Sequence, residues 1–177
     1  MKNIIIFCII SALLGISLYI MQKNIPFRSK TYDVALAKSV VATPTHAQIW
    51  FFKDNRWQQE KIKMVQHADT QINAHALVQQ WLNVCWQEKV FTKRVQVQNT
   101  LLDSTGTLLY ISFDRSPFDV QESTHHALYC FEGLLKTLHT NTIPVQRVQL
   151  LVHHEIINDN RLNLGFAWPI TGFLKTQ

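Results

Sequence analysis

The sequence predicts an α+β domain that follows an apolar N-terminal segment. Two stretches carry apolar residues at helical spacing, and several shorter stretches alternate or are rich in β-branched and aromatic residues. Turn-forming residues separate these stretches. The expected order is β-β-α-β-β-α-β-β. Both helices should lie on one face of a mainly antiparallel sheet, because that arrangement buries both apolar stripes in one core.

The N-terminal stretch is the most apolar part of the chain. Residues 4–21 carry no charge, and the run is long enough to cross the core of a bilayer as a helix. No small-residue cleavage pattern follows it, and Cys8 lies inside the run rather than just after it, where a lipoprotein would need a cysteine. We therefore predict that residues 1–22 form an uncleaved signal anchor, with a cleaved signal peptide as the alternative. A very short N-terminal tail favours an extracytoplasmic domain.

A linker and a hairpin are expected next. Residues 23–46 lack periodicity and include two prolines, which indicates a linker ahead of a domain at 47–177. Ile49–Phe52 is a short apolar strand followed by turn-forming residues, and Trp57–Val65 alternates well enough to pair back with it.

Two amphipathic helices are predicted. The first begins at Asp69 or Thr70, either of which can accept hydrogen bonds from the free N–H groups of a first turn, and it ends near Glu88. The second begins at Ser123 or Thr124. Their apolar faces contain Ala74, Leu77, Val78, Trp81 and Cys85 in the first helix, and Ala127, Cys130, Phe131, Leu134, Leu135 and Leu138 in the second.

The remaining strands lie around the second helix. Arg94–Leu102 and Thr107–Phe113 flank a Gly-containing four-residue connection, which favours a hairpin. Val145–Val152 reads as a buried strand after the helix, and Leu162–Phe166 as a weaker strand near the end.

Four phrases of the chain resemble a known family when they are taken in order. They are Ile49–Phe52, Tyr110–Asp114, Leu134–Leu138 and Val145–Val152. Together they resemble the GerMN domain, a membrane-tethered extracytoplasmic α+β module named after a bacterial sporulation and germination protein. The resemblance covers about residues 47–170.

The chain also departs from this family pattern. It has no Gly-Pro after the first helix, and it has His153-His154 in a turn where the family often has glycine. The resemblance implies a non-enzymatic binding or scaffold module of the bacterial cell envelope, in a sporulation, germination or envelope-assembly context. An envelope protein or a second copy of the chain would be its partner, and a wall polymer or small ligand is the alternative.

The charge distribution excludes one class of partner. The formal net charge is +5, but the basic residues are scattered, with only a small cluster at Lys89, Lys93 and Arg94. A nucleic-acid-binding domain concentrates its positive charge on one face. We therefore expect no nucleic-acid partner.

For the histidines and cysteines, a structural role is favoured over metal binding or catalysis. The two adjacent histidine pairs cannot chelate alone, because neighbours on a helix or strand point in different directions, so no metal or cofactor is expected. Cys85 and Cys130 are read as buried thiols, with a disulfide between the helices as the alternative. His126 lies one helical turn before Cys130, but an enzyme built on this pair is the least favoured hypothesis.

Five residues are candidates for contact with a partner or ligand. Asp114, Arg115 and Asp119 lie in the loop before the second helix, His153 follows the closing strand, and Trp168 lies in an irregular tail. Turn chemistry and helix capping are the alternative role of the two aspartates, and docking of the tail is the alternative role of Trp168.

Overall fold

The computed structural model describes residues 43–118, 123–157 and 162–173. These residues belong to one compact unit, Val40–Gln177. The predicted signal anchor and Asp119 lie outside the described residues. No helix in the described ranges is long and apolar enough to cross a membrane.

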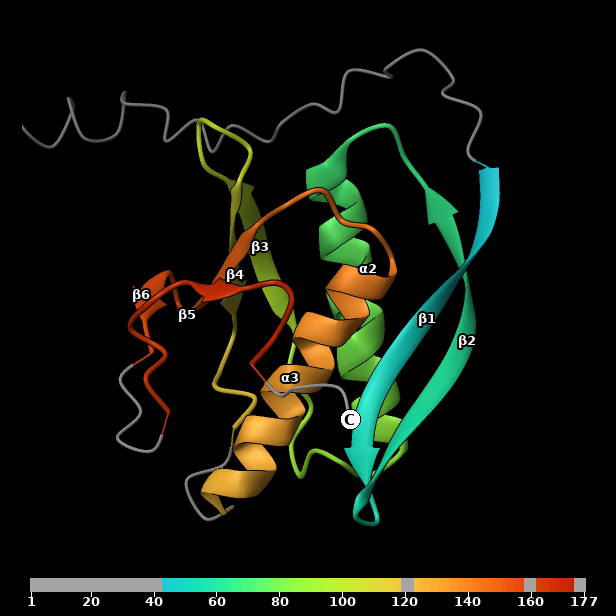
Figure 1. Cartoon of the computed structure of the whole chain (residues 1–177), viewed down its shortest axis with the longest axis vertical. Helices are drawn as coiled ribbons and strands as arrows, with labels where there is room; N and C mark the ends of the chain where they lie inside the picture. The colour runs from blue at the N-terminus through green and yellow to red at the C-terminus, as the bar shows by residue number, and fades with distance from the viewer. Residues whose placement is uncertain (1–42, 119–122, 158–161, 174–177) are drawn as a thin grey trace, which may run out of the picture. The chain divides into compact units, whose positions relative to one another are not determined.

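The domain is α+β, as predicted, with two helices and mostly antiparallel strand pairs (Figure 1). Its elements are β1 (Thr43–Lys53), β2 (Arg56–Gln66), α2 (Thr70–Gln87), β3 (Val97–Leu102), β4 (Leu108–Phe113), α3 (Thr124–Thr140), β5 (Arg147–Val152), β6 (Glu155–Ile156) and β7 (Trp168–Pro169).

Both helices begin where the sequence predicts. The Asp69 side chain accepts hydrogen bonds from the backbone N–H groups of Gln71 (2.7 Å) and Ile72 (3.4 Å). The Ser123 side chain accepts one from His126 N at 3.2 Å. Each cap satisfies donors that the first turn leaves without helical partners.

The prediction of a single sheet with both helices on one face is wrong, although most strand pairs are antiparallel as predicted. The hairpin β1–β2 forms a sheet of its own, whereas β3, β4, β5 and β6 follow one another in a second sheet with β7 beside β5. Strands β4 and β5 are parallel, and α3 supplies the crossover that a parallel pair requires. The helices therefore lie between the hairpin and the second sheet rather than on the outside of a single sheet (Figure 1).

Side chains of α3 and of its C-cap residue, Asn141, explain why the hairpin stays apart from the other sheet. Asn141 donates to Gln48 O at 2.8 Å and accepts from Gln48 N at 2.9 Å. Thr137 Oγ1 accepts from Trp50 N at 2.9 Å. The lack of a side chain at Gly133 lets α3 approach this edge, because a Cβ there would lie 2.9 Å from Trp50 O. The polar edge of β1 is therefore satisfied by a helix instead of a neighbouring strand.

The strand predicted at Leu162–Phe166 is also wrong. Leu162 and Leu164 are buried, but they lie in a turn. The carbonyl of Leu164 accepts from the Gln149 side chain at 2.7 Å, so a buried amide takes the place of a strand partner. The short strand β7 follows and pairs with β5.

One core cluster joins the helices to the strands, and every apolar-face residue predicted for the helices is buried in it. Cys85 and Cys130 belong to this core. Each is a thiol, and no disulfide joins them. Burial raises the pKa of the Cys85 thiol well above its usual range, and the neighbouring Cys130 adds to that shift.

Candidate ligand-binding site

The carboxyl ends of β4 and β5 bring distant parts of the sequence together. Because these strands are parallel, with Phe113 opposite Val152, the segments that follow them leave the sheet at the same edge. Asp114 and Arg115 follow β4, and His153 follows β5. In open sheets with parallel strands, ligands commonly bind beyond these ends.

A hollow of about 570 Å³ opens at this edge, and we call it the β4–β5 pocket. Its lining residues come from the segment before β3, the loop after β4 and the turn after β5: Thr92, Lys93, Asp114, Arg115, Ser116, Pro117, Phe118 and His153. Three of the five candidate contact residues, Asp114, Arg115 and His153, thus meet in one place. Trp168 is not part of the lining.

Asp114 braces the pocket rather than offering a free carboxylate. Its Oδ1 accepts from Gln96 N at 2.8 Å, and Gln96 O accepts from Asp114 N at 3.0 Å. Its Oδ2 accepts from Arg115 Nε at 3.1 Å. The Arg115 side chain is 58 % exposed, so the carboxylate holds the inner edge of a guanidinium that faces solvent.

His153 and His154 form the tight turn between β5 and β6. Their φ angles are 51° and 68°, as a two-residue hairpin turn of the mirror-image type requires. Such angles are uncommon for residues other than glycine, although asparagine, aspartate and histidine adopt them several-fold more often than the rest. The turn is secured by a hydrogen bond from His153 N to Phe113 O at 3.0 Å. Histidine therefore occupies a position where glycine would be easier to accommodate.

A chain of hydrogen bonds orients the imidazole of His153. His154 N donates to Ser112 Oγ at 3.0 Å, and this hydroxyl donates to Gln98 Oε1 at 3.4 Å. Gln98 Nε2 in turn lies 3.4 Å from His153 Nδ1. Since an amide nitrogen only donates, Nδ1 is the acceptor, and the ring proton of the neutral imidazole is on Nε2.

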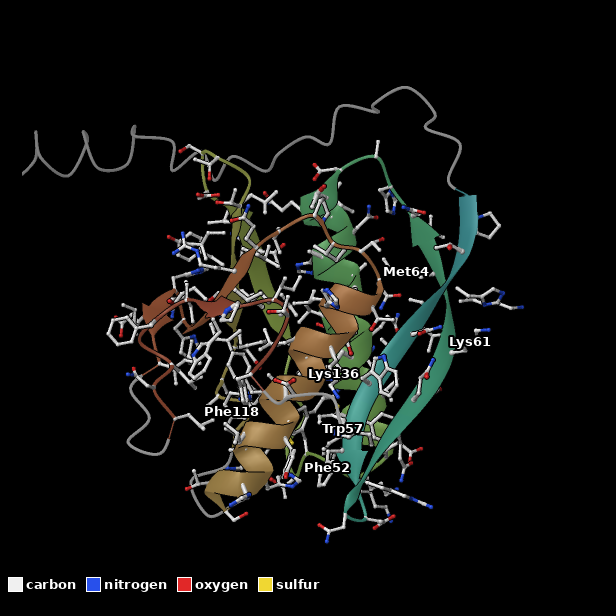
Figure 2. All side chains as sticks on the ribbon, viewed as in Figure 1. Phe52, Trp57, Lys61, Met64, Phe118 and Lys136 are labelled. Atoms are coloured by element: carbon white, nitrogen blue, oxygen red, sulfur yellow. The ribbon has the colours of Figure 1, made fainter. Side chains whose placement is uncertain are left out.

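The loop after β4 is fixed by its own contacts. Ser116 Oγ accepts from Phe118 N at 3.2 Å and donates to Phe118 O at 3.1 Å. The Phe118 side chain is only 2 % exposed and meets Phe131 of α3 edge to face, with 6.2 Å between the ring centroids. Figure 2 shows Phe118 beside α3. The described part of the loop is thereby anchored to the core.

Trp168 docks the tail against the domain. Its ring packs against Phe131 and Phe173, with centroid distances of 5.7 and 5.2 Å, and its Nε1 donates to Asn163 O at 3.0 Å. Two of the five predicted contact residues, Asp114 and Trp168, therefore have a clear bracing or packing role.

His126 and Cys130 do meet, as their spacing predicts. Cys130 Sγ lies 3.4 Å from His126 Nε2, and the same nitrogen lies 3.3 Å from Val90 O. A carbonyl oxygen only accepts, so Nε2 carries the proton in this contact and cannot take one from the thiol. No group of three or more His, Cys, Asp or Glu side chains within the described ranges is placed to hold a metal ion.

A second hollow, of about 420 Å³, lies at the open end of the β1–β2 hairpin, away from its turn, and we call it the hairpin-end pocket. It is lined by the first residues of β1, the last of β2, the start of α2 and the segment after α3, and its lining contains no Asp, Glu, Lys or Arg. Asn73 in its wall donates to His67 O at 2.6 Å and accepts from His67 N at 2.7 Å. The two asparagines of its lining, Asn73 and Asn141, thus bind the backbone of neighbouring segments.

Aromatic residues fasten the tip of the hairpin to α3. Phe52 stacks on Tyr129 with 4.1 Å between the ring centroids, and Trp57 meets both rings edge to face. Lys136 Nζ lies 4.1 Å from the centre of the Trp57 ring and 5.8 Å from that of Trp50. Figure 2 shows Lys136 and Trp57 between α3 and the hairpin. This cluster is a packing contact with a partly exposed outer side.

Sequence reasoning missed part of the site. Lys93 was noticed only as a member of a small basic cluster, and Gln98 and Ser112 only as residues of a strand pattern. Their role depends on the pairing of β4 with β5, which places the turn after β5 beside β3 and β4. A prediction of that parallel pair would have found them.

Comparisons with known proteins add one distant likeness. No protein-family model matches the chain, and neither does any curated protein. A solved structure from Clostridium perfringens, described as a "putative lipoprotein", is similar with 12 % sequence identity and a TM-score of 0.49. That match covers 72 % of this chain and 87 % of the other. The resemblance to the GerMN domain stays a prediction.

Proposed function

We propose that this protein is a non-catalytic binding module of a bacterial cell envelope, which takes its ligand in the β4–β5 pocket. The observation that carries the proposal is the convergence of Asp114, Arg115 and His153 at the carboxyl ends of two parallel strands. Concave sites with a few oriented polar groups are the usual form of ligand-binding sites.

The N-terminal stretch supports a tether to the membrane. Residues 4–21 are uncharged and largely apolar, which suits a signal anchor that holds an extracytoplasmic domain through a linker. The resemblance to the GerMN domain favours the same location and adds sporulation, germination or envelope assembly as contexts.

The geometry of His126 and Cys130 supports a non-catalytic role. The Cys130 side chain is 2 % exposed, whereas a reactive thiolate needs access to its substrate and a base that can take its proton. His126 Nε2 instead donates to Val90 O.

Photo-crosslinking in native membranes tests this function. A photoreactive residue in place of Thr92, in the β4–β5 pocket, should capture a ligand or partner, whereas one in place of Thr140, in the hairpin-end pocket, should capture none. Both positions are exposed, so the two variants are matched. Capture from Thr140 alone, or equally from both positions, would contradict the proposal.

A second candidate function is self-assembly through β2. This strand, Arg56–Gln66, pairs only with β1 among the described residues, which leaves its other edge available to a second chain. Exposed lysines along the strand, such as Lys61 and Lys63, oppose such pairing between identical chains. A cysteine in place of Gln59 tests the idea: oxidative crosslinking of two copies would support it, and purely monomeric protein would refute it.

A further inference from the structure

We propose that the domain rests on the lipid bilayer through the side chains of Ile156 and Phe166, which we call the Ile156–Phe166 patch. This inference rests on the membrane tether of the proposed function, and it adds an orientation in which the β4–β5 pocket opens near the membrane surface. Three features lead to it: how exposed the patch is, how firmly it is held and how small it is.

The patch contains the two most exposed large apolar side chains of the described residues. Phe166 is 68 % exposed and Ile156 is 61 % exposed, whereas the other exposed large apolar residues in the described ranges lie between 42 and 49 %. The two belong to neighbouring segments, because a Cβ on Gly165 would lie 3.9 Å from Ile156 Cγ2. Apolar side chains that are exposed together mark contact surfaces, whereas single ones are ordinary.

The turn that carries Phe166 is held from both sides. Leu164 is buried, and its carbonyl accepts from the Gln149 side chain at 2.7 Å. On the other side, Trp168 Nε1 donates to Asn163 O at 3.0 Å. The backbone on either side of Phe166 is therefore fixed by contacts with the domain. Its ring is presented to solvent without a large loss of backbone freedom on contact.

Ile156 belongs to the short strand β6, where it pairs with Leu151. Ile157 beside it is buried, so the two isoleucines face different surroundings. Strand β6 lies on the side of the second sheet away from the hairpin (Figure 1). It pairs with the last residues of β5, and His153, which follows β5, lines the β4–β5 pocket. The patch and the pocket thus share one edge of the domain.

The patch is too small for a stable protein interface. One aromatic side chain buries at most about 250 Å², whereas a stable interface covers about 800 Å² on each partner. The neighbouring residues His154, Glu155 and Asn163 are exposed and polar, so they do not extend the apolar surface. A lipid surface sets no such requirement, because single apolar side chains can enter the boundary between headgroups and acyl chains.

The tether makes so small a contact sufficient. Residues 23–42, between the predicted anchor and β1, can span about 70 Å when extended. A domain of this size is roughly 40 Å across, so each of its faces can reach the bilayer. Because the anchor already keeps the domain at the membrane, contact costs little further translational freedom. The face with the most exposed apolar side chains is then favoured.

Photo-crosslinking of the full chain in native membranes tests the inference. A photoreactive phenylalanine analogue in place of Phe166 should capture phospholipid severalfold more than one in place of Leu101. Leu101 is 49 % exposed and lies near the end of β3 away from the β4–β5 pocket, so it is the matched control. Mass spectrometry distinguishes a captured lipid from a captured protein.

A second variant tests the same contact from its neighbour. With the photoreactive residue in place of Ile156, Phe166→Asp should lower lipid capture severalfold, because a charged side chain resists entry into apolar surroundings. Leu101→Asp, which adds the same charge at the control position, should leave capture from position 156 unchanged. Both substitutions are at exposed residues, so neither should disturb folding.

The outcomes separate the membrane contact from the proposed function. Lipid captured from position 166 but not from position 101 would support the inference. Equal lipid capture from both, capture of a protein alone or of nothing from position 166, or an effect of Leu101→Asp equal to that of Phe166→Asp would overturn it. If position 92 captured a ligand while position 166 captured no lipid, the proposed function would stand and the membrane contact would fail.

Discussion

The two hollows of this domain differ in what their polar groups do. In the hairpin-end pocket, amides such as Asn73 and Asn141 bind the backbone of neighbouring segments, and no charged side chain lines the space. In the β4–β5 pocket, the internal bonds of Asp114 and Gln98 orient the donors of Arg115 and His153. The volumes are similar, so volume does not distinguish them.

This difference indicates how the two ends of the fold divide their roles. One end uses its polar side chains to replace strand neighbours and hold the hairpin against α3. The other end uses them to hold charged and titratable groups in position. Substitutions at the first end should therefore change stability, and substitutions at the second should change binding.

The largest effect on stability is expected for Gly133→Ala. The added Cβ would lie 2.9 Å from Trp50 O, a backbone atom that cannot rotate away, so α3 and β1 must move apart. Overpacking of this kind should lower the free energy of unfolding by roughly 2–3 kcal/mol, as measured by urea denaturation. Gly165→Ala is the control, since its nearest atom is a side-chain oxygen at 3.6 Å. Equal stability of Gly133→Ala and wild type would show that this contact is looser than described.

A smaller loss of stability is expected for Asn141→Ala. It removes the partners of both Gln48 N and Gln48 O at the edge of β1. Water can replace part of this contact, so the free energy of unfolding should fall by about 1–2 kcal/mol. Thr140→Ala, at the exposed neighbouring position, should have little effect. The contrast between the ends would break down if Asn141→Ala abolished ligand capture from position 92 while leaving the unfolding transition unchanged.

Arg115→Ala should show the reverse pattern. Its side chain is 58 % exposed and its ion pair with Asp114 is near the surface, so the free energy of unfolding should change by less than about 0.5 kcal/mol. Capture of a ligand in native membranes by a photoreactive residue at position 92 should nonetheless be lost. Thermal unfolding of the purified variant and photo-crosslinking in membranes would check both parts. A large loss of stability would mean that the residue is structural and would remove the distinction drawn here.

The smallest effect concerns Asp103, in the turn that precedes β4 and so at the far end from the β4–β5 pocket. Hydrogen bonds from Leu108 N and then from the Thr105 hydroxyl lower the pKa of this carboxyl below its ordinary value of about 3.9. Its stabilising contribution is therefore complete above that ordinary value and disappears as the pH falls through the lower folded-state pKa. The stability difference between wild type and Asp103→Asn should be constant near neutral pH and shrink below about pH 4. A difference that grows on acidification would contradict this sign.

The sequence predicted local structure better than it predicted how the elements meet. Asp69 and Ser123 cap helices where expected, because capping depends on the residue and its next few neighbours. The separate hairpin was missed because it depends on Thr137 and Asn141, whose side chains meet β1 far away in the sequence. Nothing in the pattern of α3 marks these two polar residues as partners of a strand edge.

The site was predictable in the same partial way. Asp114, Arg115 and His153 were chosen because they lie in loops that interrupt regular patterns, and loops often carry function. That they share a pocket follows from the parallel pairing of β4 and β5, which alternation and turn signals do not specify. Trp168 was chosen because an aromatic side chain in an irregular tail can contact a partner, and the structure packs it against Phe131 and Phe173, in agreement with the docking alternative.

The central claim is that ligand binds at the carboxyl ends of β4 and β5 and not at the hairpin end. The most direct test is photo-crosslinking in native membranes from position 92, in the β4–β5 pocket, and from position 140, in the hairpin-end pocket. The account predicts a captured ligand from position 92 and none from position 140. Capture from position 140 alone, or equal capture from both positions, would contradict it.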